Sequence, residues 1–155
     1  MKLLLTLLVA VTACRQEATR APASVVFVCE HGAAKSVVAS EYFNKLAAER
    51  GLAIHAIARG ADPQAGISIA AVKGLREDGL STSLAEPRPL TPSEARSAAR
   101  VVAFDCELPK MKAFKDIGAC WNDVPTVGDD YAAARDTIHV HITAMIDQLI
   151  AQPGS

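Results

Sequence analysis

The fold of this chain is decided by the stretch Ser24-Val-Val-Phe-Val-Cys-Glu-His-Gly-Ala-Ala-Lys-Ser36. Val25–Val28 is a short, continuous apolar run rich in β-branched residues, which is typical of a buried strand in a parallel sheet. A helical pattern follows directly, so Cys29 ends a strand and opens a loop into a helix N-terminus. Backbone N–H groups converge at such a place, and the positive end of the helix dipole adds to them. The stretch therefore predicts an anion-binding loop.

Cys29 is the candidate nucleophile of this loop. The field that favours an anion also favours the thiolate, which is the reactive form of cysteine. A nucleophile and an oxyanion cradle in one loop can attack phosphate or a similar tetrahedral anion. A small core cysteine is the alternative, and Glu30 is a poor neighbour for an anion. The expected anion-binding residues are Glu30, His31, Gly32, Ala33, Ala34 and Lys35.

Composition excludes several classes of function. The chain has 155 residues, of which 50% are hydrophobic, so it can form one domain with a full core. The formal net charge is −1 and aromatic residues are few, so nothing indicates nucleic-acid binding. His139 and His141 lie on different faces of a helix, and Cys106 and Cys120 lack the short spacing of a zinc site. We therefore expect no metal and no cofactor.

Residues 1–14 read as a lipoprotein-type signal segment. Lys2 precedes an apolar run that is too short to span a bilayer. The small residues before Cys14 resemble a bacterial lipobox, in which the cysteine is lipidated; a plain secretory signal is the alternative. Residues 15–23 are polar and predict a tether. The expected location is the cell envelope, as a periplasmic lipoprotein on the outer membrane, with membrane contact through the lipid anchor only.

Strand and helix patterns alternate along residues 24–150. Further strands are predicted at 53–58, 100–104 and, more weakly, 118–121. Helices are predicted at 35–50 and 66–78, and a third begins at the Thr91-Pro-Ser-Glu94 capping box. The final helix is capped by Asp129 or Asp130. Its apolar stripe consists of Ile138, Ile142, Met145, Ile146 and Leu149.

This order predicts an α/β fold, a three-layer αβα sandwich with a four-stranded, parallel, doubly wound sheet. The phosphate-binding loop follows the first strand. Ligands of such sheets bind at the carboxyl ends of the strands. Both Cys29 and the pair Asp105-Cys106 lie at such ends.

Residues 24–150 resemble the low-molecular-weight protein tyrosine phosphatases and their relatives, the thioredoxin-coupled arsenate reductases. The loop Cys29-x5-Lys35-Ser36, opening a helix, carries the resemblance. Four further segments follow in the family's order. They are 58–61 after the second strand, 80–91, the third strand at 101–105, and Trp121-Asn-Asp-Val-Pro125 before a long final helix.

The resemblance implies a role for each of four residues. Cys29 attacks phosphorus and Ser36 hydrogen-bonds its thiolate. Lys35 takes the position of the arginine that clamps the phosphoryl oxygens, although an ammonium cannot make a planar two-point clamp. Asp123 matches the aspartate that protonates the leaving oxygen, but Val124 separates it from the proline. Gly32 replaces the family's loop asparagine, and a loop reshaped around Lys35 would pair it with Glu30.

Three functions follow from this comparison. The first is a phosphomonoesterase with a cysteinyl-phosphate intermediate, acting on a small phosphorylated anion or a phosphoprotein. The second is an arsenate reductase that uses Cys29 with Cys106 and Cys120 as a redox relay. The third is a non-catalytic lipoprotein that holds an oxyanion without turnover, which the lysine in place of arginine keeps open.

Overall fold

The computed structural model describes residues 24–82, 86–113 and 117–152. The signal segment, the tether and Cys14 lie outside the described residues. The strands are β1 (Ser24–Cys29), β2 (His55–Gly60), β3 (Arg100–Phe104) and β4 (Ala119–Trp121). The helices are α1 (Lys35–Glu49), α2 (Ile69–Glu77), α3 (Pro92–Ser97) and α4 (Tyr131–Ala151), with a 3-10 turn, η1, at Met111–Ala113.

The four strands form one parallel sheet in the order β2-β1-β3-β4. This confirms the predicted α/β class with a parallel, doubly wound sheet. β1 lies in the middle, with Cys29 opposite Gly60 and Val28 opposite Ala103. The loops after β2 and β3 therefore flank the loop that follows Cys29.

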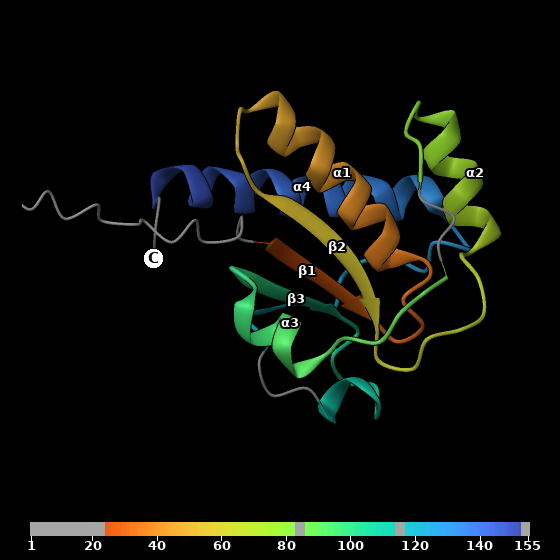
Figure 1. Cartoon of the computed structure of the whole chain (residues 1–155). Coiled ribbons are helices and arrows are strands. Elements are labelled where there is room, and N and C mark those ends of the chain that lie inside the picture. The colour runs from red at the N-terminus through yellow and green to blue at the C-terminus, as the bar shows by residue number, and fades with distance from the viewer. Residues whose placement is uncertain (1–23, 83–85, 114–116, 153–155) are drawn as a thin grey trace, which may run out of the picture.

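Alternate side chains of each strand point to opposite faces. Phe27 and Phe104 belong to the larger core cluster, which packs against α1, α2 and α4. Val28 and Ala103 belong to the smaller cluster, which packs against α3 and Met111. Figure 1 shows the same three layers, with α1, α2 and α4 on one side of the sheet and α3 and η1 on the other.

Most predicted helix starts and stops are confirmed. Thr91 and Glu94 form the capping box of α3, and the side chain of Asp130, not Asp129, caps α4. The apolar stripe of α4 is buried except for the half-buried Leu149. None of the helices within the described residues is long and apolar enough to cross a membrane.

Two boundaries differ from the prediction. α2 begins at Ile69 rather than Gly66, because the Ser68 side chain accepts a hydrogen bond from the Ala71 N–H and so caps the helix. β2 runs from His55 to Gly60 rather than from 53 to 58. Its register follows β1, whose first residue Ser24 pairs with His55.

Candidate active site

Cys29 ends β1 and lies at the start of the loop that leads into α1. Its Sγ atom is 3.1 Å from Ser36 Oγ, and both residues are buried. Cys29 is a free cysteine. The structure therefore brings the predicted nucleophile and its predicted hydroxyl partner together.

Four carbonyl groups of the loop turn toward one neighbouring segment. Cys29, Glu30 and His31 accept hydrogen bonds from the N–H groups of Ala61, Asp62 and Gln64, at 3.0, 2.7 and 3.3 Å. Ala33 accepts one from the N–H of Ser68 at 2.9 Å. In a trans peptide the carbonyl and the next N–H point in opposite directions. The N–H groups of residues 30, 31, 32 and 34 therefore point away from this segment, as an anion cradle requires.

The N-terminus of α1 completes the cradle. Ala34 occupies the cap position without a side-chain cap, and the first turn holds no acidic residue. The N–H of Val38 donates to the carbonyl of Ala34, so the N–H groups of residues 35–37 precede the first helical bond. An anion is the natural partner of such an uncapped end.

Gly32 and Gly60 hold the loop against the end of β2. Gly32 has φ +64°, and a Cβ atom there would lie 2.7 Å from the backbone N of Gly60. A Cβ on Gly60 would lie 2.9 Å from the backbone N of Gly32. A side chain at either position would therefore require the backbone to shift.

Lys35 is paired with Asp105, not with Glu30 as the sequence suggested. Its Nζ lies 2.9 and 2.7 Å from the two carboxylate oxygens of Asp105. The Lys35 side chain is only 12% exposed. The pairing of β1 with β3 brings the end of β3, and with it Asp105, beside the start of α1. Glu30 instead lies 3.7 Å from His31 Nε2 at the exposed mouth of the loop.

Asp123 lies in the loop after β4 and contacts His141 of α4. Its two carboxylate oxygens are each 2.9 Å from His141 Nε2. The imidazole also stacks on Trp121, with ring centroids 4.6 Å apart. The hydrogen bond with His141 lowers the pKa of Asp123 below its ordinary value. Asp123 is therefore held as a carboxylate, which weakens it as a proton donor.

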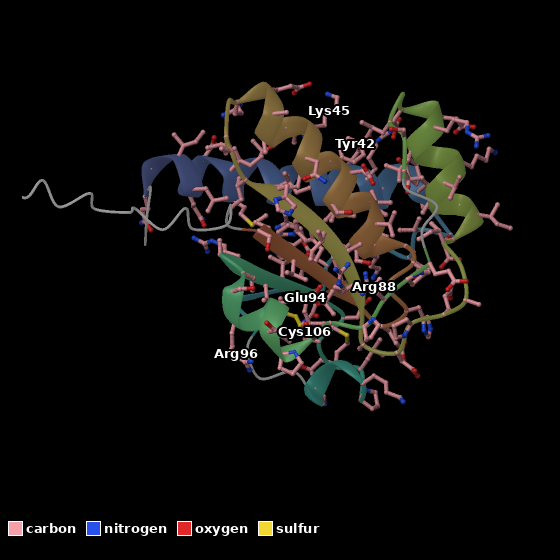
Figure 2. The ribbon with its side chains drawn as sticks, viewed as in Figure 1. Tyr42, Lys45, Arg88, Glu94, Arg96 and Cys106 are labelled. Atoms are coloured by element: carbon pink, nitrogen blue, oxygen red, sulfur yellow. A yellow bond between two sulfur atoms is a disulfide. The ribbon has the colours of Figure 1, made fainter. Side chains whose placement is uncertain are left out.

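Cys106 and Cys120 are joined by a disulfide. Cys120 lies in β4 opposite Ala103, so the register of β3 and β4 brings the two cysteines together across 14 residues of sequence. Figure 2 shows Cys106 on the side of the sheet that carries α3. Cys106 and Cys120 are thus bonded to each other, whereas the thiol of Cys29 is free.

The segment after β3 also reaches across the mouth of the site. Lys110 Nζ lies 3.2 Å from Asp62 Oδ2 in the segment after β2. The Asp62 carbonyl oxygen lies 3.2 Å from Nδ1 of His31. The loops on the two sides of the cysteine loop are thus linked to each other over it.

Sequence reasoning missed the roles of three residues. The sequence puts Asp105 at the carboxyl end of a strand, which is a signal for a site residue, but it shows no partner for the side chain. His141 and Lys110 carried no signal, because their partners are distant in sequence. Within the described residues no group of three or more His, Cys, Asp or Glu side chains could hold a metal ion.

A groove of about 540 Å³ runs along α2, beside the segment that binds the carbonyls of the loop. Three aliphatic and three charged residues line it, and none of them belongs to the cysteine loop. Ile69, one of its residues, is 85% exposed. The chemistry of the site therefore lies outside this groove.

Comparison with solved structures supports the same fold. YfkJ from Bacillus subtilis aligns with a TM-score of 0.74 at 19% identity, covering 86% of this chain and 98% of that one. A low molecular weight phosphotyrosine phosphatase from Vibrio cholerae O395 aligns with a TM-score of 0.71 at 15% identity, covering 84% and 99%. The thioredoxin-dependent arsenate reductase Cg_ArsC1' from Corynebacterium glutamicum gives 0.68 at 22%, covering 87% and 65%.

A sequence search of curated proteins found no match. The profile described as low molecular weight phosphotyrosine protein phosphatase matches residues 24–147, which span β1 to most of α4. The chain therefore belongs to the low molecular weight phosphotyrosine protein phosphatase family.

Proposed function

We propose that the chain is a phosphomonoesterase that works through a cysteinyl-phosphate intermediate. One observation carries the proposal. A free Cys29 lies 3.1 Å from Ser36 at the mouth of a loop whose N–H groups, with the uncapped start of α1, are arranged for an oxyanion. The hydroxyl of Ser36 stabilises the thiolate, and the loop N–H groups hold the phosphoryl oxygens.

The reaction then has two steps. The thiolate of Cys29 attacks phosphorus, forming an S–P bond while the P–O bond to the leaving group breaks. Water next attacks phosphorus, breaks the S–P bond and releases inorganic phosphate and the thiolate. Because Asp123 is held as a carboxylate by His141, it donates a proton poorly to the first leaving group. We therefore infer that aryl phosphates, whose leaving groups are acidic, are turned over better than alkyl phosphates.

The test is hydrolysis of p-nitrophenyl phosphate and an alkyl phosphate by the full chain. Cys29→Ser should abolish turnover. Cys106→Ser, which leaves Cys29 intact, is the matched control and should retain it. Rapid alkylation of Cys29 by iodoacetamide that phosphate slows would locate the anion beside the sulfur. Anion protection without any turnover would instead identify an oxyanion-binding protein.

Arsenate reduction is the second candidate, and the Cys106–Cys120 disulfide favours it. In this reaction the Cys29 sulfur displaces one arsenate oxygen as water and forms an As–S bond. The Cys106 thiol then attacks the Cys29 sulfur, the bond electrons pass to arsenic, and arsenite leaves. Cys120 finally displaces Cys29 and leaves the Cys106–Cys120 disulfide, which an external dithiol reduces.

This alternative makes a separate prediction for the same variants. With dithiothreitol as reductant, arsenite formation should need all three cysteines, so Cys106→Ser should stop it. Turnover of p-nitrophenyl phosphate with no arsenite production would exclude the reductase. A difference between these two activities thus assigns the function.

We further propose that the chain is a lipoprotein of the cell envelope, anchored through Cys14. The composition of residues 1–14 supports this. The disulfide adds support, because disulfides persist in oxidising compartments and are rare in reducing ones. Mass spectrometry of the mature protein from its native membrane tests it. An N-terminus without lipid at Cys14 would contradict the proposal.

A further inference from the structure

The carboxylate of Asp105 occupies the ammonium group of Lys35, which a bound anion would otherwise contact. Both oxygens of Asp105 contact the Lys35 ammonium, at 2.9 and 2.7 Å. An ammonium has three N–H donors, so a single N–H is left for a ligand. A guanidinium in this place would have five donors and could serve both partners, so the competition is specific to a lysine.

The charges around the loop are unusual for an anion site. Lys35 directly follows the loop at the start of α1 and Lys110 lies across the mouth paired with Asp62, while Asp105 and Glu30 contribute carboxylates. The ion pair cancels the charge of Lys35, so the attraction for an oxyanion comes mainly from backbone N–H groups. A free ammonium attracts a doubly charged anion about twice as strongly as a singly charged one at the same distance, and this difference is lost when Asp105 neutralises the ammonium.

Asp105 is held firmly in this position. It has φ 51°, a left-handed conformation that aspartate adopts more readily than most residues. Its carbonyl accepts from the N–H of Leu108 at 3.0 Å. The next residue, Cys106, donates its N–H to Asn122 Oδ1 at 2.9 Å and is bonded to Cys120. The backbone is therefore fixed on the C-terminal side of Asp105.

We propose that Asp105 is a specificity-determining residue that acts through Lys35. Its carboxylate competes with the oxyanion for the ammonium, so it lowers the affinity of the loop for doubly charged oxyanions relative to singly charged ones. The proposal rests on the anion-binding loop of the proposed function, but it does not require turnover. Asp105 itself does not touch the reacting atoms.

The test compares two tetrahedral oxyanions of different charge, perchlorate and sulfate. Their affinities are measured by calorimetry at one pH on the full chain carrying Cys29→Ser, which prevents covalent chemistry. Asp105→Asn is added to this background. Glu107→Gln is the matched control, because it removes the same charge from the same segment. Glu107 is 83% exposed and pairs with Lys112.

Asp105→Asn should raise the ratio of sulfate to perchlorate affinity by about tenfold, the worth of one regained charge-assisted hydrogen bond. Glu107→Gln should leave the ratio unchanged. An unchanged ratio in Asp105→Asn, or loss of binding of both anions, would overturn the proposal. If the chain has neither phosphatase nor reductase activity, the proposed function is wrong, but the change in the ratio of sulfate to perchlorate affinity is still expected.

A second measurement covers the case in which Asp105→Asn does not fold. The carboxyl carbon of Asp105 is followed by NMR in the Cys29→Ser chain during titration with each anion. Sulfate should shift its resonance more than perchlorate at equal saturation, because sulfate draws Lys35 away from the carboxylate more strongly. A resonance that does not respond to sulfate contradicts the proposal.

Discussion

Ser36 and Ser40 lie one turn apart on α1, and both are buried. Only Ser36 contacts the cysteine sulfur, whereas Ser40 donates to the carbonyl of Val37 at 2.9 Å. The two residues therefore form a matched pair. The hydroxyl of Ser36 contacts the cysteine sulfur, and the hydroxyl of Ser40 contacts the helix backbone.

Ser36→Ala should lower kcat for p-nitrophenyl phosphate by about ten- to a hundredfold, because one hydrogen bond to a charged sulfur is worth about 1.5–3 kcal/mol. Ser40→Ala should change kcat less than about threefold, although it can cost stability. The measurement is steady-state turnover beside thermal unfolding of both variants. Equal losses of kcat would show that burial, not contact with sulfur, explains the effect.

Lys35→Arg should raise kcat/KM by about tenfold, since a guanidinium can keep Asp105 and still donate to the phosphoryl oxygens. The control is Lys45→Arg at an exposed site of the same helix, where Lys45 pairs with Glu49 (Figure 2). This control should leave kcat/KM unchanged. A decrease in Lys35→Arg would mean that the loop is fitted to the smaller ammonium.

Besides their apolar packing, α3 and α2 each make a contact with another element that a single substitution can test. α3 is joined to β2 because Glu94 Oε1 accepts from Arg59 Nη2 at 2.6 Å, while Glu94 Oε2 closes the capping box. α2 approaches α4 at Gly74, where a Cβ atom would overlap the ring of Tyr131. That ring is fixed, because its hydroxyl donates to Asp78 at 2.6 Å.

The hydrogen bond from Arg59 lowers the pKa of Glu94 from 4.5 to about 2. A carboxyl group with a depressed pKa in the folded state stabilises the fold above its unfolded pKa and loses this as pH falls through the folded value. Glu94→Gln should therefore destabilise the protein by about 1–3 kcal/mol at neutral pH. The gap between wild type and variant should close between pH 4.5 and about 2, as followed by urea unfolding. A gap that does not depend on pH would contradict this.

Gly74→Ala should destabilise the fold by about 1–3 kcal/mol, because the methyl group forces the fixed Tyr131 ring to move. This cost exceeds the gain of about 1 kcal/mol that alanine brings to a helix interior. Gly66→Ala, where a Cβ would meet nothing within 4 Å, is the control and should be close to neutral. The readout is the urea midpoint of each variant. A stabilised Gly74→Ala would mean that the helices separate easily.

For the molecule as a whole, the Cys106–Cys120 disulfide closes a loop that contains η1 and joins β3 to β4. Closing a loop of this length restricts the unfolded chain and stabilises the fold by about 3 kcal/mol in the chain-entropy model. Cys120→Ser should lower the free energy of unfolding by about that amount, and reduction of the wild type should match it. Reduction should not affect Cys120→Ser further, which is the internal control.

Local patterns in the sequence predicted the parallel sheet, the cysteine loop and the long final helix. β1, the capping box at Thr91 and the cap at Asp130 depend on neighbouring residues, so the sequence shows them directly. The side-chain contacts within the site cannot be predicted in this way, because they join residues that are far apart in the sequence. Lys35 and Asp105 are 70 residues apart, and their pairing depends on the order of strands in the sheet.

The same limit applies to Asp123 and the two cysteines. The sequence placed Asp123 in a loop before the last helix, but not its contact with His141, which follows from how α4 packs over Trp121. The spacing of Cys106 and Cys120 alone does not show whether they join a redox relay with Cys29, form a disulfide or are free cysteines of the core. The short β4 strand, predicted only weakly, is what brings them together.

The direction of β1 has a practical consequence. Ser24 enters at the amino edge of the sheet, and Cys29 leaves at the opposite edge, about 17 Å away for a six-residue strand. Asp147, near the end of α4, bonds Arg50 at the end of α1, so the last helix also finishes near the edge where the chain enters (Figure 1). The two ends of the described part of the chain therefore lie at the edge of the sheet opposite the mouth of the loop, so a tag attached beyond either end starts away from the site.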